Sequence, residues 1–368
     1  PANLESAWGI YQDHCGNDTE QDKRPDDEPT KCEIIDRSAC SMSDGKYVMN
    51  IRYTGWGKNT ISFKTNPNPA LFNEDNRNIG QCALDKIRKA HGKHQLLDGA
   101  CVDSLGANWP ATLNYRKDHF RYAKYPATFD PNGKVALHNQ ISYCEFLDYL
   151  RDYVHSQNGV LYGNGIYNYP SRWTLEPEHP RGRDIMLGRF FMGARVDVAS
   201  SEAGIRCNQE RFEFMRVALG RKLYDLTNSH WEDPTEVEEY FNKCLVYTMF
   251  GENVRHYNAD PDKIRQYHPE FYKRDRKLIT WFINNNRKLA NAGWEPVTYA
   301  KIQSEDVLIE RYGSGDAVYL AIMSESQKAK NCVLTIDLES LGFGSSEYPD
   351  LKIEEIARSQ PIDIKAPN

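Results

Sequence analysis

The segment Leu96-Leu97-Asp98-Gly99-Ala100-Cys101-Val102-Asp103-Ser104-Leu105 decides how the chain folds. Asp98-Gly99 is typical of a turn, and the apolar run from Ala100 to Val102 is typical of a short strand buried on both faces. Asp103 follows at the end of this strand, and the carboxyl ends of parallel strands are where α/β proteins bind ligands. Because an unpaired buried charge is costly, Asp103 is either functional or the N-cap of the segment that follows. The segment alone leaves both interpretations open.

The composition is that of a globular protein and excludes several classes. The chain has 368 residues, of which 40% are hydrophobic and 27% are charged, enough for one large domain and a small one or for two medium domains. A net charge of -6 argues against a nucleic-acid partner. Since no apolar run reaches membrane-spanning length, we expect no membrane span. The 22 Tyr and 7 Trp suit stacking on sugars but also suit core packing.

The nine cysteines include no Cys-x-x-Cys pair, so we expect no metal site, and no motif indicates another cofactor. Cys32 and Cys40 lie in a polar segment and could close a short disulfide loop. Asn17-Asp18-Thr19 is the one glycosylation sequon, which predicts a glycan on Asn17. The sequon and the cysteines together favour a secreted, extracellular protein, with a lysosome-like compartment as the alternative.

Strand and helix patterns alternate over the first 290 residues or so, which predicts a parallel sheet. Polar residues follow these strands repeatedly, as in a (β/α)8 barrel, and no glycine-rich phosphate loop indicates a doubly wound sheet. We count seven strands where a barrel needs eight, and the chain begins at Pro1 without an initiator Met. The fold predicted is therefore α/β, a (β/α)8 TIM barrel lacking its first βα unit. The expected strands are 7–12, 46–53, 99–104, 159–165, 194–199, 221–226 and 244–250.

The missing strand would come from an N-terminal fragment of the same precursor or from a partner chain. Helices are expected at 79–91, 142–157, 181–193, 208–219, 235–244 and 262–291. Residues 18–45 are expected to form an exposed loop, and residues 105–142 a long aromatic loop. Beyond Gly293, short strands without helices predict a small antiparallel β-domain. The predicted domains are thus 1–293, an incomplete barrel, and 294–368.

Two acidic residues stand directly after expected strands that have one strand between them. Asp103 would end barrel strand four and Glu202 barrel strand six, so their carboxylates would converge over the pocket. Glycoside hydrolysis uses two such carboxylates, about 5 Å apart for retention and ~6.5–9.5 Å apart for inversion. For Glu202 the alternative is an exposed loop glutamate.

Several motifs resemble a group of large, mostly uncharacterised bacterial proteins related to glycoside hydrolases. These proteins have a (β/α)8 barrel followed by a β-sandwich, and the nearest understood relatives are retaining α-glycosidases with an Asp nucleophile on strand four. The resemblance implies that Asp103 is the nucleophile, that Glu202 is the acid/base, and that 294–368 is a β-sandwich. The motifs that carry it are residues 66–72, 98–104, 114–120, 126–130 and 292–298.

Further residues near the expected strand ends could bind the sugar, and each has an ordinary structural alternative. Tyr53, Trp56 and Trp109 could stack on sugar rings or pack in the core. Asn164 could bond a sugar hydroxyl or close a turn. Arg52 and Arg116 could hold an acidic substituent or form salt bridges. We therefore expect a hydrolase of an α-linked oligo- or polysaccharide; the alternative is an inactive barrel that serves as a carbohydrate-binding or structural extracellular protein.

Overall fold

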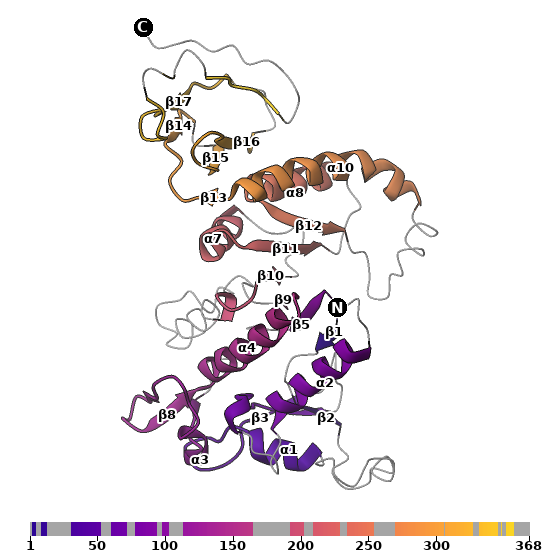
Figure 1. The fold of residues 1–368 in the computed structure, drawn as a ribbon, viewed down its shortest axis with the longest axis vertical. Helices are drawn as coiled ribbons and strands as arrows, with labels where there is room; N and C mark the ends of the chain where they lie inside the picture. The colour runs from indigo at the N-terminus through magenta and orange to yellow at the C-terminus, as the bar shows by residue number, and fades with distance from the viewer. Residues whose placement is uncertain are drawn as a thin grey trace. The chain divides into compact units, whose positions relative to one another are not determined.

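The computed structural model shows a mixed α/β protein that divides into two compact units, Pro1–Ser200 and Ser201–Asn368 (Figure 1). Parallel strands and several small antiparallel sheets are both present. The residues that the structure describes are 2–4, 9–12, 31–52, 60–71, 78–93, 98–102, 113–164, 192–201, 209–228, 234–253, 269–304, 306–326, 331–344, 347 and 351–356.

Four strands form the parallel sheet of the first unit. They are β1 (Ala2–Leu4), β5 (Gly99–Val102), β9 (Val160–Asn164) and β10 (Val198–Ser201), in this order across the sheet. Each is parallel to its neighbour. The expected parallel arrangement is confirmed for β5, β9 and β10, whereas β1 was not expected from the sequence.

Two helices connect these strands: α2 (Ile79–Lys93) runs between β1 and β5, and α4 (Asn139–Ser156) between β5 and β9. Both lie on the same face of the strands (Figure 1), as right-handed crossovers between successive neighbouring strands require. The apolar side chains of α4 that the sequence pattern predicts are buried, among them Leu147, Leu150 and Val154. A barrel wall has this arrangement, and so does one half of a doubly wound sheet.

The connections at the two ends of this sheet differ in length. Each connection from a crossover helix to the next parallel strand is short, spanning 94–98 and 157–159. Each connection from a parallel strand to its crossover helix, α2 or α4, is long, spanning 5–78 and 103–138. The long connections of these two crossovers therefore both follow the carboxyl ends of strands.

The first long connection contains a helix and a separate antiparallel sheet. The helix is α1 (Lys31–Ser38), and the sheet has the order β2 (Gly9–Gln12), β4 (Thr60–Phe63), β3 (Met49–Arg52). The prediction that 7–12 and 46–53 are strands of the parallel sheet is therefore wrong. Both pair with β4, a strand that the sequence analysis did not identify.

The predicted exposed loop over 18–45 is wrong in its described part as well. Residues 31–38 form α1, and the apolar and small side chains near the end of this helix pack inside the protein. Ile35 and residues 38–41 are buried. Cys40 is a free thiol that lies within 3.1 Å of Asn139 Oδ1, so the predicted Cys32–Cys40 disulfide is wrong too. The thiol is held inside, facing α4, instead of toward a surface loop.

The predicted aromatic loop over 105–142 contains regular structure in its described part. Strands β6 (Leu113–Asn114), β8 (Val135–His138) and β7 (Thr128–Phe129) form an antiparallel sheet in that order. Helix α3 (Lys117–Phe120) lies between β6 and β7. This prediction was wrong because such short strands leave no periodic pattern in the sequence.

The second unit contains the parallel pair β11 (Leu223–Asn228) and β12 (Met249–Asn253). Its described helices are α7 (Gln209–Leu219), α8 (Pro234–Val246) and α10 (Pro269–Ala292). Helices were expected at all three places.

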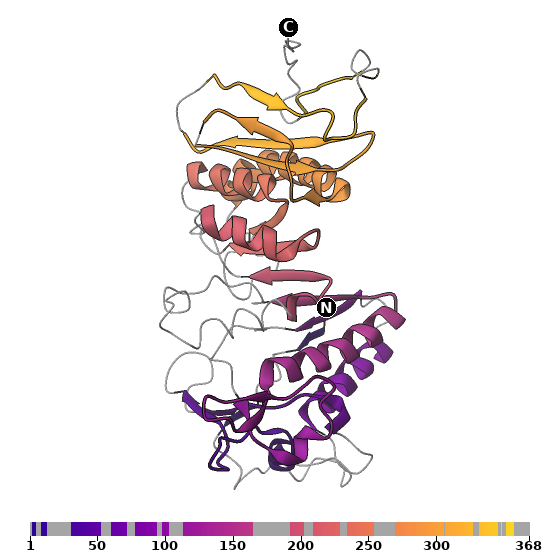
Figure 2. The ribbon, with the colours of Figure 1, turned by 90° about the vertical axis from the view of Figure 1, so that its left-hand side faces the viewer.

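The antiparallel strands expected beyond Gly293 are confirmed. They form one sheet of order β13 (Trp294–Glu295), β15 (Val307–Tyr312), β16 (Tyr319–Ser324), and a pair of β14 (Ala300–Ile302) with β17 (Leu334–Ile336). In Figure 2 they are the orange and yellow arrows beside the helices of the same unit.

A buried arginine joins the helices of the second unit to these strands. The Arg216 guanidinium donates to the Tyr247 carbonyl oxygen at 2.8 Å and lies 5.7 Å from the centroid of the Trp294 ring. The Tyr312 hydroxyl donates to the Val246 carbonyl oxygen at 2.5 Å. The predicted boundary at residue 293 lies inside this unit. The β-sandwich over 294–368 stays a prediction. Closure of the parallel strands into a barrel also stays a prediction.

Candidate functional site

The candidate site lies at the carboxyl ends of β5, β9 and β10. Gly163 of β9 pairs in register with Val102 of β5 on one side and with Ala199 of β10 on the other. Since neighbouring strands are spaced about 4.8 Å apart, Val102 and Ala199 are roughly 10 Å apart, and β10 continues two residues beyond this level, to Ser201. Asp103 and Glu202, the next residues of the two chain segments, lie outside the described residues.

One polar pair at this end of the sheet is described. The Ser200 hydroxyl donates to Asn164 Oδ1 at 2.8 Å, and the two residues are level in the register of β9 and β10. Ser200 is buried and Asn164 is half-buried. Because the amide oxygen faces Ser200, the amide nitrogen of Asn164 points away from it. Asn164 is the last residue of β9, and its bond with Ser200 holds the side chain at the strand end.

The other predicted sugar-binding residues are placed less directly. Tyr53, Trp56 and Trp109 lie outside the described residues, as does Asn17. Arg52 is the last residue of β3. Since β3 belongs to the antiparallel sheet, the expectation that Arg52 ends a strand of the parallel sheet is wrong.

Arg116 takes the structural alternative. Its guanidinium forms an ion pair with Asp118 at 2.5 Å and donates to the Ala39 carbonyl oxygen at 3.2 Å and to that of Asp36. These bonds fix α3 against α1, and they satisfy the guanidinium without an acidic ligand.

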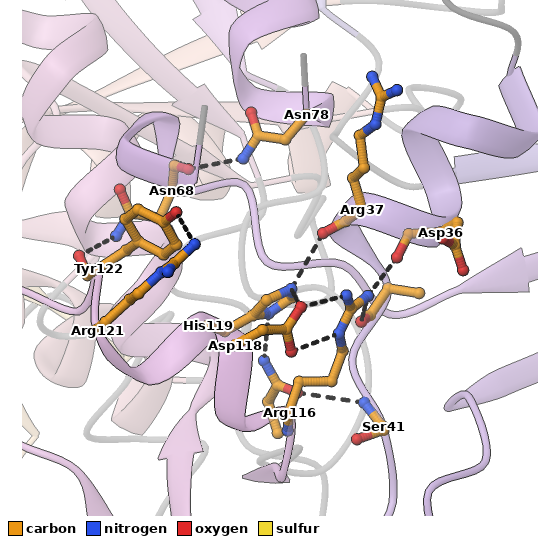
Figure 3. A network of polar contacts seen from close by, with 12 residues as sticks. Asp36, Arg37, Ser41, Asn68, Asn78, Arg116, Asp118, His119, Arg121 and Tyr122 are labelled. Atoms are coloured by element: carbon orange, nitrogen blue, oxygen red, sulfur yellow. Dashed lines mark hydrogen bonds and ion pairs between the residues drawn. The ribbon is translucent and has the colours of Figure 1, made fainter. Parts of the chain in front are cut away.

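A group of residues that the sequence analysis missed joins the two long connections (Figure 3). Asn114 Oδ1 accepts hydrogen bonds from the backbone N–H groups of Ser41 at 3.2 Å and Arg116 at 3.1 Å. Its amide nitrogen therefore faces His119 Nδ1, at 2.9 Å. The other ring nitrogen of His119 lies 3.0 Å from the Arg37 carbonyl oxygen. We call Ser41, Asn114 and His119, with the Arg37 carbonyl, the histidine junction.

These bonds assign one protonation state to the His119 ring. An amide N–H donates to Nδ1, so Nδ1 carries no proton, and Nε2 donates to the Arg37 carbonyl. The side chain is 1% exposed. Burial, aided by the positive charge of Arg116, lowers the pKa of His119 from 6.5 to about 4. The imidazole is neutral and enclosed, so it acts as a structural group.

A buried carboxylate anchors the same connections on α4. Glu145, which is 3% exposed, accepts hydrogen bonds from the backbone N–H groups of Lys124 at 2.7 Å and Tyr125 at 3.0 Å, and from the Asn68 amide. The Asn78 amide donates to the Asn68 carbonyl oxygen at 2.6 Å (Figure 3). Burial raises the pKa of Glu145. These partners are protein donors that hold loops in place, so Glu145 has the environment of an anchor and not of a group that faces substrate.

No protein-family model matches the chain, and no curated protein and no solved structure is significantly similar to it. The resemblance to glycoside-hydrolase-like proteins therefore stays a prediction. Within the described ranges there is no cluster of three His, Cys, Asp or Glu side chains able to hold a metal ion. A search of the same ranges for a helix long and apolar enough to cross a bilayer found none.

Proposed function

We propose that the protein is a glycoside hydrolase that cleaves an α-linked oligo- or polysaccharide, with Asp103 and Glu202 as its paired carboxylates. The observation that carries the proposal is the strand order β5, β9, β10 with parallel pairing throughout. The two acidic residues directly follow the carboxyl ends of two strands that have one strand, β9, between them. In the proposal both strands continue in register, which brings Asp103 level with Asn164 and Ser200.

The uneven connection lengths also support a functional site at the carboxyl ends of the parallel strands. Enzymes built on parallel strands form their sites from the loops that follow the strands, and the opposite loops serve stability. In the first unit, the connections 5–78 and 103–138 follow strands, whereas the turns before β5 and β9 are short. This is the arrangement expected of a substrate site assembled around Asp103.

We further propose that the parallel strands close into a barrel. In the described part of the chain six strands have a parallel neighbour: β1, β5, β9, β10, β11 and β12. A barrel needs eight, and in the proposal the strands upstream of β1 come from an N-terminal fragment of the precursor or from a partner chain. With two strands upstream, β5 is again barrel strand four and β10 barrel strand six.

In this mechanism Asp103 attacks the anomeric carbon while Glu202 protonates the leaving oxygen. Water then hydrolyses the glycosyl ester, with Glu202 acting as the base that takes up the proton. Asn164, at the end of β9 beside Ser200, is proposed as a polar contact to a sugar hydroxyl. Tyr53, Trp56 and Trp109 are proposed as stacking surfaces and Arg52 as a polar contact.

The test is the hydrolysis of a panel of aryl α-glycosides by Asp103→Asn and Glu202→Gln, with Asp98→Asn as the control. Asp98 is an exposed carboxylate immediately before β5, at the opposite end of the strand. We expect each of the first two changes to lower kcat by at least about 100-fold, and Asp98→Asn to leave it unchanged. Wild-type rates in Asp103→Asn would contradict the proposal. Glycan binding without any turnover by the native chain would favour the inactive, carbohydrate-binding alternative.

Secretion, or delivery to a lysosome-like compartment, belongs to the same proposal, with Asn17 as the glycosylated residue. Six cysteines in the described part of the chain are not in a disulfide: Cys40, Cys82, Cys101, Cys144, Cys244 and Cys332. Any disulfide would therefore involve cysteines other than these. A mass decrease on enzymatic deglycosylation, absent in Asn17→Gln, tests the glycan.

A further inference from the structure

Helix α10 carries a concentrated positive charge on its outward face. Between Lys273 and Ala292 the one acidic residue is Asp275, whose side chain is only 3% exposed. Five cations on this segment are exposed, in a chain whose net charge is -6. We call Lys273, Arg276, Lys277, Arg287 and Lys288 the basic face of α10.

The helical positions explain why these side chains share one side. Asp275, Phe282, Asn286 and Leu289 are buried and recur at helical spacing, which fixes the inward side of α10. The members of the basic face fall on the opposite side of the helix and are exposed. Within the described ranges no ion pair joins Lys273, Lys277, Arg287 or Lys288 to an acidic residue.

The basic face is long and divided. Lys273, Arg276 and Lys277 form one group near the start of the helix, and Arg287 and Lys288 form a second. At 1.5 Å per residue, Lys277 and Arg287 are about 15 Å apart along the helix axis. Between the two groups the exposed residues are uncharged: Thr280, Ile283 and Asn284. A compact anion would contact one group, whereas a linear polyanion can contact both.

We infer that the basic face of α10 binds a linear anionic glycan that carries carboxylate or sulfate groups. This inference rests on the proposed function for the choice of a glycan, and on the charge and length of the face for the choice of an acidic, extended one. Lysine and arginine bind carboxylate and sulfate oxygens through charge-assisted hydrogen bonds. The site would hold an extended substrate or matrix chain apart from the reacting bond.

Two other polyanions fit the face less well. An interfacial helix buries its apolar side in the lipid, but the apolar side of α10 faces the protein core, with Phe282 1% exposed and Leu289 5% exposed. A protein that binds nucleic acid generally has a basic surface overall, and this chain is acidic.

The experiment measures binding of the full chain to a heparin oligosaccharide at about 0.15 M NaCl. The variant Lys277→Gln/Arg287→Gln/Lys288→Gln removes three charges from the basic face. The matched control Lys86→Gln/Lys89→Gln/Lys93→Gln removes three charges from exposed positions on α2. We expect the first variant to raise Kd about tenfold and the control to change it less than about twofold. Circular dichroism verifies that both variants fold.

Equal effects of the two variants, or no binding by the native chain, would overturn the inference. So would tighter binding to duplex DNA or to phosphatidylserine vesicles than to heparin, if the same three residues are required. Hydrolysis of neutral aryl α-glycosides is measured in parallel. If the native chain cleaves a glycoside but does not bind heparin, only the inference fails. If heparin binding depends on α10 but the native chain cleaves no glycoside, only the proposed function fails.

Discussion

Asn114 shows how a neutral amide determines the protonation state of a neighbouring histidine. Its oxygen accepts two backbone N–H groups, so its nitrogen has to face the His119 ring. If Nδ1 were protonated, its N–H would face the N–H group of the Asn114 amide, in a site that water does not reach. The histidine junction therefore contributes stability only while His119 is neutral.

This geometry predicts a loss of stability in acid. The pKa of His119 is lowered from 6.5 to about 4 in the folded chain. As the pH falls below 6.5 the unfolded chain gains a proton that the folded chain does not, so the free energy of unfolding decreases until the folded His119 also titrates near pH 4. The total effect is about 3 kcal/mol. Urea unfolding of the native chain and of His119→Gln across this pH range measures it.

Gln is the informative substitution because it keeps one acceptor and one donor but does not titrate. We expect His119→Gln to lose most of this acid-dependent decrease, and the exposed His155→Gln to keep it. Identical pH dependence in the native chain and His119→Gln would show that the junction does not control acid stability.

At the scale of elements, β5 illustrates a constraint that a single residue places on the sheet. The first residue of β5 is Gly99, and a Cβ at this position would lie 1.9 Å from the Val160 carbonyl oxygen of β9. The close approach allows the hydrogen bond from Val160 N to the Asp98 carbonyl oxygen, at 2.8 Å. Gly99 thus sets the pairing of the two strands whose ends form part of the candidate site.

We predict that Gly99→Ala destabilises the chain by about 1–3 kcal/mol, because the new methyl group meets backbone and not a movable side chain. Gly92→Ala is the control, since it is a helical glycine with no atom within 4 Å of the added Cβ. It should be neutral or slightly stabilising. Thermal unfolding of the two variants separates these outcomes, and equal stability would argue against the close β5–β9 approach.

The elements that the sequence predicts well are those with long periodic patterns or continuous apolar runs. Helices α2 and α4 and strands β5 and β9 belong to this class, and their burial follows the pattern. The pairing of β2 and β3 was not predictable, because alternation identifies a strand but not its partner. The short strands β6 and β7 are two residues each, too short for any period to appear.

For the site, the sequence predicted the neighbourhood of β5 and β10 and the position of Asn164. It did not predict that Asn68, within Asn66-Pro67-Asn68-Pro69, is buried and bonded to Glu145. Proline and asparagine indicate a turn, but whether that turn is solvated depends on contacts with Tyr122 and Glu145, which are distant in sequence. The histidine junction was missed for the same reason.

At the scale of the whole molecule, the chain combines two units that differ in where additional structure follows their parallel strands. The first unit carries its extra structure after the carboxyl ends of parallel strands, and the second adds antiparallel strands after α10. Under the proposed function the first arrangement encloses a substrate, and the basic face of α10 holds an acidic chain. The first of these depends on the claim that Asp103 and Glu202 share one pocket.

Chemical cross-linking tests this claim without requiring activity. The double variant Asp103→Cys/Glu202→Cys is treated with a bis-maleimide of about 8 Å reach, within the ~5–9.5 Å that separates the carboxyls of glycosidase pairs. The control is Asp98→Cys/Glu202→Cys, with one thiol at the opposite end of β5. Mass spectrometry of the digested protein should find the 103–202 cross-link and no 98–202 cross-link. A cross-link between 98 and 202 alone, or none in either variant, would contradict the account.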